Sequence, residues 1–255
     1  MYHLRPGLAT LAVAALVIAG CSSGTTPQPT LEPRDEVVAA LQSTAELQTV
    51  HALIRIELRD SNGQDYLVTI EGDVDVAARE LDVNAMIDPE TLGIREAQLV
   101  VVDGSVYSRL GNESWSVSGG TGQDPLESVP TTARIAAAVE EALRDPATTI
   151  RLEGAEDCGD ARCDRIRVEV PAEVAWRAVN RMVQPVDQPA ASLQPLPSGF
   201  PGFAIDLWIE QGTHRLRQAT NTTVVDGNRL SIIVALSAHD APVTIRPPVQ
   251  PSPNG

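Results

Sequence analysis

Two cysteines in the second half of the chain have a spacing that suits a disulfide bond. Cys158 and Cys163 enclose four residues, among them Gly159 and Asp160, which favour a tight turn. Strand-like runs lie on both sides, so the pair would close the tip of a β-hairpin. A redox or metal role is the alternative, but a metal site needs more ligands than this segment offers. The spacing therefore predicts a structural disulfide between Cys158 and Cys163.

The sequence contains few of the patterns that accompany catalysis. It has no HExxH, GxSxG, P-loop or SxxK motif, and the glycine-rich stretch at residues 119–123 does not lead from a strand into a helix. His51, His214 and His239 show no ligand spacing relative to one another, and we interpret them as surface or rim residues. We therefore predict that the protein is not an enzyme and needs no cofactor.

One group of carboxylates has a spacing that deserves a separate interpretation. Glu71, Asp73 and Asp75 alternate along the chain and would share one face of a strand. Carboxylate oxygens in such an arrangement can bind Ca²⁺. A solvated sheet face is the more common explanation, and we predict no metal site.

The N-terminus has the pattern of an export signal. Arg5 precedes an apolar run at residues 8–19, which is too short to span a bilayer and has the length of a signal-peptide core. The run ends in VIAGC, which resembles the bacterial lipobox, and the resemblance implies cleavage after residue 20 and acylation of Cys21. The alternative is a signal peptide cut elsewhere, with Cys21 incidental. Two or three acyl chains such as palmitate would anchor the protein permanently at the extracytoplasmic face of the cell membrane.

The composition excludes one class of partner and suggests a tether. Asp and Glu number 34 against 19 arginines and no lysine, which gives a net charge of −15. Such a chain repels phosphate backbones, so nucleic acid is not a predicted partner. Residues 21–33 are rich in Ser, Thr and Pro and are predicted to form a flexible tether. One domain is predicted at residues 34–246, followed by a disordered tail at 247–255.

The domain is predicted to be α+β. About eleven runs have the period-two pattern of strands, and short turn signals such as Asp103-Gly104 join many of them. Hairpin connections indicate an antiparallel sheet, and Gly72 is expected to form a bulge or bend within it. Three helices are predicted, at residues 34–47, 131–144 and 172–183. Because the helices occur singly after runs of strands, they should cover one face of the sheet.

The side chains of the predicted helices are small relative to the sheet face that they must cover. Short, Ala-rich helices are a thin cover for so many strands, and they favour a cavity; ordinary close packing is the alternative. Alternation along the strands and spacing along the helices give the expected lining of such a cavity. The candidates are Ile54, Ile56, Val68, Ile70, Val83, Val101 and Leu207 from strands, and Ile135, Val139 and Val179 from helices.

The order of elements resembles the LppX/LprAFG lipoproteins of actinobacteria, a family related in fold to the carriers LolA and LolB. The likeness lies in "LQTVHALIRIEL", in "REAQLVVVDGSVYSRLGNESWSV", and in "FAIDLWIEQGTHRLRQA" with the closing strand "LSIIVALSAHDAPVTIRPP". The resemblance implies a strongly curved half-barrel sheet with helices on its concave face. It also implies an apolar cavity for acylated lipids or glycolipids. The Cys pair and the Pro-rich loop after residue 184 are departures from the pattern.

Two functions follow as expectations. The first is a membrane-anchored lipoprotein that binds, and possibly transports, a lipid or other hydrophobic molecule in an apolar cavity. The second is an envelope lipoprotein with a solid core that acts as a protein-interaction or sensor module.

Overall fold

The computed structural model describes residues 31–87, 96–119, 132–183, 195–196, 199–200, 202–225 and 227–249. The chain divides into two compact units, Met1–Thr30 and Leu31–Gly255, and every described residue belongs to the second. The predicted N-terminal signal and most of the tether therefore lie outside the described residues. Among the described residues, no helix has the length and apolar character needed to cross a membrane.

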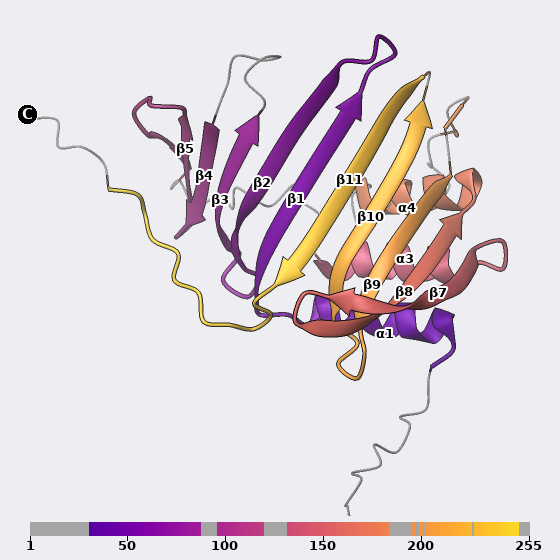
Figure 1. Ribbon diagram of the computed structural model, residues 1–255. Coiled ribbons are helices and arrows are strands. Elements are labelled where there is room, and N and C mark those ends of the chain that lie inside the picture. The colour runs from indigo at the N-terminus through magenta and orange to yellow at the C-terminus, as the bar shows by residue number, and fades with distance from the viewer. Residues whose placement is uncertain are drawn as a thin grey trace, which may run out of the picture. The chain divides into compact units, whose positions relative to one another are not determined.

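Eleven antiparallel strands form one sheet in the described part of the chain (Figure 1). Their order is β6-β5-β4-β3-β2-β1-β11-β10-β9-β8-β7. Consecutive strands are therefore neighbours in the sheet, except β6 and β7, which are its two edges, and the last strand pairs with the first. The strands are β1 (Thr49–Arg59), β2 (Asp65–Asp75), β3 (Glu80–Ile87), β4 (Glu96–Val102), β5 (Ser105–Leu110), β6 (Ser116–Gly119), β7 (Thr149–Cys158), β8 (Ala161–Val170), β9 (Phe203–Glu210), β10 (Leu216–Val225) and β11 (Asn228–Ser237). The prediction of consecutive antiparallel hairpins is confirmed.

Three helices in the described part of the chain are α1 (Pro33–Ala45), α3 (Thr132–Arg144) and α4 (Ala172–Val183). Pro33 stands at the first turn of α1, where its missing N–H costs nothing. The three helices lie on one face of the sheet (Figure 1), with α1 packed on α3 and α3 on α4. The predicted α+β class and its one-sided helical layer are therefore confirmed.

The strong curvature expected from the family resemblance is wrong for this structure. The sheet is twisted and open, and it is not strongly curled. Sheets bend sharply where bulges or register shifts occur. The described strand pairs have such shifts at two places, Leu152/Gly154 and Leu216/Gln218, both at the β7–β10 end. The pairs from β1 to β6 run in continuous register, so they contain no register shift that would bend the sheet sharply.

A glycine in β2 shows a second difference from expectation. Gly72 forms no bulge, since it pairs in register with Ala52 and Val83. Its role is close approach: a Cβ at this position would lie 2.7 Å from the Cα of Val83 and would collide with the carbonyl oxygen of Asp82. The neighbouring backbone thus requires a residue without a side chain here.

Gly72→Ala is expected to lower the free energy of unfolding by about 1–3 kcal/mol, because β2 and β3 must separate to admit the methyl group. Urea denaturation followed by circular dichroism measures the change. An unchanged midpoint would show that the two strands separate without cost.

The predicted disulfide is present. Cys158 and Cys163 are bonded, with their Cα atoms 5.8 Å apart, and they close the tip of the β7–β8 hairpin. Gly159 at the tip has a φ of 77°, which a residue with a side chain rarely adopts. Cys163 is completely buried, while Cys158 is half-buried.

Replacing both cysteines by Ala is expected to cost about 2 kcal/mol of stability, because a short loop restricts the unfolded chain only modestly. The fold should persist, since the strand pairing of β7 with β8 does not depend on the bond. Thermal unfolding of the double variant and of the reduced parent protein should agree. A circular dichroism spectrum that lost its strand signal would contradict this expectation.

Two side-chain contacts at the start of α1 fix this helix to the sheet. The carboxylate of Glu36, which is buried, accepts a hydrogen bond from His214 Nδ1 at 2.7 Å. His214 lies in the β9–β10 turn. Arg34 Nη2 donates to the carbonyl oxygen of Thr148 at 2.9 Å, just before β7. Helix α1 is therefore held at both the β7 edge and the β9–β10 turn.

Candidate functional site

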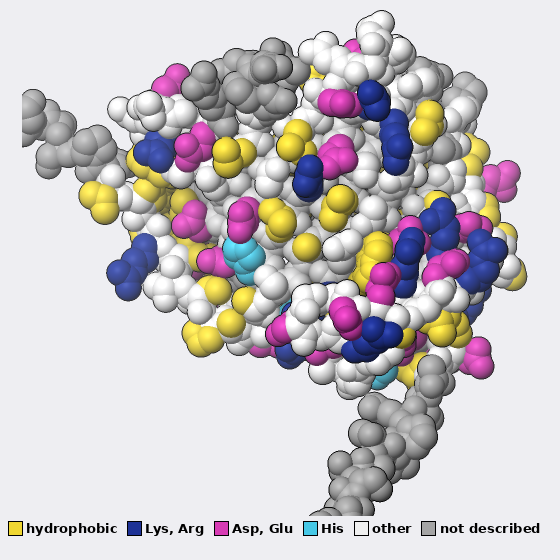
Figure 2. Space-filling view, in the orientation of Figure 1, with side chains coloured by type: hydrophobic (Ala, Val, Ile, Leu, Met, Phe, Trp, Pro, Cys, Tyr) yellow, Lys and Arg dark blue, Asp and Glu magenta, His cyan; other side chains and the backbone are white. Residues whose placement is uncertain are grey.

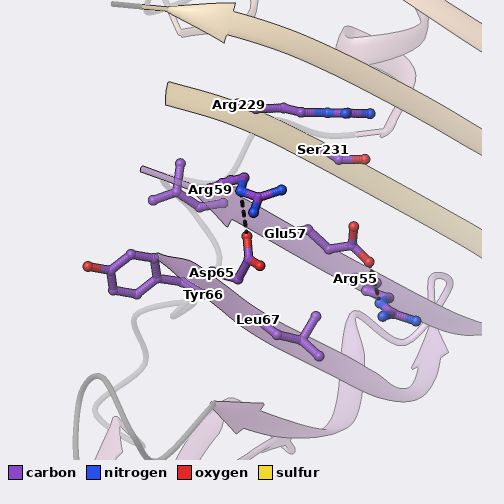
Figure 3. Close-up of a pocket in the computed structure, with 9 residues that line it drawn as sticks. Arg55, Glu57, Arg59, Asp65, Tyr66, Leu67, Arg229 and Ser231 are labelled. Carbon is purple, nitrogen blue, oxygen red and sulfur yellow. Dashed lines mark ion pairs between the residues drawn. The ribbon is translucent and has the colours of Figure 1, made fainter. Parts of the chain in front are cut away.

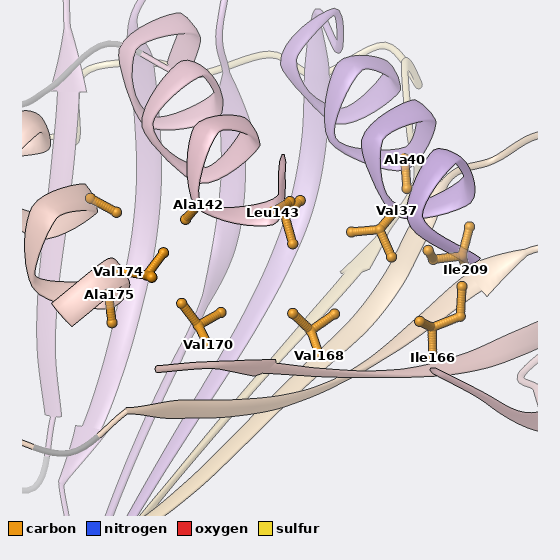
Figure 4. Close-up of a cluster of buried hydrophobic side chains, with 11 residues drawn as sticks. Val37, Ala40, Ala142, Leu143, Ile166, Val168, Val170, Val174, Ala175 and Ile209 are labelled. Atoms are coloured by element: carbon orange, nitrogen blue, oxygen red, sulfur yellow. The ribbon is translucent and has the colours of Figure 1, made fainter. Parts of the chain in front are cut away.

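The most deeply buried part of the protein lies between the helices and one end of the sheet. Ile166 and Ile209 are almost fully inaccessible, and Figure 4 shows them below α1, with Val168 and Val170 below α3. The cluster of buried apolar residues comprises Val37, Ala40, Ala142, Leu143, Ile166, Val168, Val170, Val174, Ala175, Ala178 and Ile209. This end of the sheet is where the three described helices meet it.

A cavity of about 240 Å³ remains inside this region. Every residue that lines it is apolar, and the lining combines all three described helices with β8, β9 and β10. The lining residues are Val37, Leu41, Val139, Ala142, Leu143, Val168, Val170, Ala175, Ala178, Val179, Met182, Phe203, Ile205, Leu207, Leu216 and Ala219. With no polar group to bind water, such a space favours an apolar occupant.

The structure brings three of the sequence candidates into this cavity. Val139 of α3, Val179 of α4 and Leu207 of β9 are part of its lining. Ile135, one turn before Val139, is 39% exposed and lies outside the lining. Val101 of β4 is fully buried, but it too lies outside the lining.

The remaining strand candidates lie on the same face of the sheet as the cavity, nearer to its centre. The strand register shows this directly: Ile54 is opposite Val234, Val234 is opposite Ala219, and Ala219 is opposite Leu207. Residues directly opposite one another point to the same side of a sheet. The five central candidates are half-buried and do not line the cavity: Ile54, Ile56, Val68, Ile70 and Val83.

The apolar face is therefore continuous and has two parts. Around β8 and β9 it is closed by helices, and Ile166 and Val168 are almost completely buried there. Around β1, β2, β3 and β11 it is only half-buried, as Ile54 and Val234 illustrate. The cavity adjoins the partly open part through Leu207 and Ala219, which gives an apolar molecule a surface on which to extend.

Sequence reasoning missed the contribution of β8 and β10 to the lining. Val168 and Val170 alternate with the charged residues Arg167 and Glu169, so the period-two pattern of this strand was an available signal. Leu216 and Ala219 stand either side of a register shift at Gln218, so simple alternation does not place them on one face. Val37 and Leu41 have the helical spacing that predicts α1. That spacing was the available signal that they belong to the lining.

The opposite face of the sheet carries charges rather than a continuous apolar surface. Figure 2 shows acidic and basic side chains intermingled on it. Arg167 Nη1 lies 2.9 Å from Asp206 Oδ2, and Trp208 Nε1 donates to Glu156 Oε1 at 2.8 Å. Paired charges of this kind suit contact with water, and they leave the helix-covered face as the candidate site for an apolar ligand.

His51 lies on the charged face between two of the carboxylates considered above. Its Nδ1 is 2.8 Å from Asp73 Oδ1 and its Nε2 is 3.2 Å from Glu71 Oε1. The hydrogen bond with Asp73 raises the pKa of His51, because it stabilises the protonated ring. Within the described ranges, no group of three His, Cys, Asp or Glu side chains is placed to hold a metal ion.

These features define a class: an α+β protein in which one antiparallel sheet and a layer of helices enclose an apolar cavity. Sequence comparison identifies mycobacterial proteins that are similar to this chain. The chain is 27% identical over 255 residues to the lipoarabinomannan carrier protein LprG of Mycobacterium tuberculosis, covering 95% of this chain and 94% of that protein. The LprG of Mycobacterium leprae is also 27% identical, over 94% of this chain and 93% of the relative. No protein-family model matches the sequence.

Solved structures share the fold. LprF from Mycobacterium bovis has a TM-score of 0.56 at 18% identity, covering 86% of this chain and 98% of that chain. LppX from Mycobacterium tuberculosis has a TM-score of 0.51 at 16% identity, covering 84% of this chain and 97% of that chain. The resemblance to the LppX/LprAFG lipoproteins is thus confirmed, in sequence through LprG and in fold through LprF and LppX. LprG is by name a carrier protein, which agrees with the prediction that the chain is not an enzyme.

Proposed function

We propose that this protein is an extracytoplasmic lipoprotein that holds the acyl chains of a lipid or acylated glycolipid between its helices and its sheet. The observation that carries the proposal is the cavity, whose lining is apolar throughout. Burial of apolar surface contributes about 25 cal/mol per Å², so a wholly apolar space binds hydrocarbon without any specific polar contact.

The size of the cavity limits what it holds by itself. At about 240 Å³ it is smaller than the roughly 300–1,000 Å³ pockets that enclose drug-sized ligands. It accommodates one short segment of chain. The half-buried apolar face beside it, with Ile54, Ile56 and Val68, provides the additional surface for a longer chain. The proposed ligand therefore occupies the cavity with one end and lies along the sheet with the rest.

The name of the relatives supports the choice of ligand class. LprG is by name a carrier of lipoarabinomannan, and it aligns with almost the whole chain. We propose a glycolipid ligand of similar amphipathic character, bound by its acyl chains. Transport would follow if the ligand is released to a second membrane component, and lipidation at Cys21 would keep the protein at the extracytoplasmic face of the cell membrane.

Mass spectrometry of organic extracts tests the proposal. The full chain, purified from a native membrane fraction, should yield a lipid or acylated glycolipid in stoichiometric amount. The Val139→Trp variant, prepared in the same way, should yield much less. Extracts of the parent protein that contain no stoichiometric lipid would favour the solid-core interaction or sensor module.

A further inference from the structure

A second hollow, of about 550 Å³, lies at the end of β1, β2 and β11, away from the apolar cavity (Figure 3). Arg55, Arg59 and Arg229 contribute three guanidinium groups to it. The remaining lining residues are Glu57, Leu58, Asp65, Tyr66, Leu67 and Ser231. The chain has a net charge of −15, but this hollow holds three basic side chains against two acidic ones, Glu57 and Asp65.

The strand register places two of the arginines in direct opposition. Arg59 of β1 is the cross-strand partner of Arg229 of β11. Like charges at directly opposite positions destabilise a sheet. Arg59 has partial compensation from Asp65 at 3.5 Å, whereas Arg229 makes no ion pair with any acid in the described part of the chain. The arrangement is unfavourable for folding and favourable for an anion placed between the two guanidiniums.

The two acidic residues of the hollow, Glu57 and Asp65, do not lie between the guanidiniums of Arg59 and Arg229. Glu57 pairs with Arg55 at 2.8 Å, and the side chains of Arg59 and Asp65 are 62% and 74% exposed. Ion pairs this exposed are worth little and exchange readily for a ligand. The backbone around the hollow is also held in place, because Ser61 N donates to Asn228 Oδ1 at 2.9 Å and ties two turns together.

We propose that Arg59 and Arg229 bind a phosphate group. A guanidinium donates two parallel hydrogen bonds to phosphate oxygens, and a phosphate has enough oxygens for more than one arginine. Ser231 supplies a further hydroxyl donor at the same site. Leu58 and Tyr66 belong to the helix-side face of their strands, so the hollow reaches the strand ends where both faces meet. Both a lipid headgroup and free phosphate have access to such a position.

The test uses the full chain in a non-ionic detergent and compares the parent with Arg229→Gln and Arg59→Gln. At constant ionic strength, inorganic phosphate should raise the melting temperature of the parent. Each variant should lose about tenfold or more in phosphate affinity, measured by titration calorimetry. Without phosphate, Arg229→Gln should melt no lower than the parent, because the substitution relieves the repulsion with Arg59.

Arg246→Gln is the control, since Arg246 is exposed and lies outside the hollow, and it should respond to phosphate as the parent does. A parallel titration with glycerophosphoglycerol distinguishes the source. Tighter binding of this phosphodiester than of inorganic phosphate identifies a lipid headgroup, and the reverse identifies free phosphate. If phosphate stabilises Arg229→Gln as much as the parent, or if neither compound binds, the proposal is wrong. This outcome leaves the acyl-chain proposal untouched, because the cavity shares no residue with the hollow.

Discussion

Val139→Trp is expected to abolish uptake of a fluorescent fatty acid and to change the free energy of unfolding by less than about 1 kcal/mol. Val139 lines the cavity from α3 and is half-buried, so a larger side chain has empty space to enter. The indole then occupies the volume that an acyl chain needs. In a close-packed core the same change would overpack the site and cost about 1–3 kcal/mol.

Ile135→Trp is the matched control, because it makes a similar change one helical turn earlier at a position that is 39% exposed and outside the cavity. It should leave both binding and stability near those of the parent. Chemical denaturation and fluorescence titration are measured on the same three preparations. A large loss of stability in Val139→Trp, with no lipid binding by the parent, would reject the carrier proposal.

Cys21→Ala is expected to move the protein from the membrane fraction to the soluble fraction. The apolar run at residues 8–19 and the VIAGC sequence predict acylation of this cysteine. Without the thiol no acyl chain is attached, and the chain loses about 0.8 kcal/mol of membrane affinity for every CH₂ that would be buried. Partitioning between detergent and aqueous phases measures the change.

Ser22→Ala, at the next position, is the control for this experiment and should stay in the detergent phase. If Cys21→Ala partitions with detergent as strongly as Ser22→Ala does, the anchor is not at Cys21. Intact-mass measurement of the parent protein provides a second check, because acylation adds the mass of the attached chains to residue 21.

Local patterns in the sequence determined the elements and the sides on which strand residues lie. Side chains alternate along a strand, so the period-two runs put Ile54 and Ile56 on one face of their strand, and Val68 and Ile70 on one face of theirs. Asp103-Gly104 predicted a hairpin, and both residues have the positive φ angles that such a turn requires. The Cys158–Cys163 bond followed in the same way, because it joins residues five apart across one hairpin tip.

The tertiary structure alone decided which part of that face is closed by helices. By alternation alone, apolar residues on β1, β2 and β9 were equally good candidates for the cavity lining. Because α1, α3 and α4 pack at the β8–β10 end, Leu207 lines the cavity and Ile54 does not. Ile135 shares a helix face with Val139 but lies one turn nearer the N-terminus of α3, where it is 39% exposed and outside the lining. The sequence pattern predicts a bulge or bend at Gly72, but the need for glycine there comes from the backbone of β3, which local sequence does not describe. Arg59 and Arg229 are 170 positions apart, and only the pairing of β1 with β11 brings their charges together.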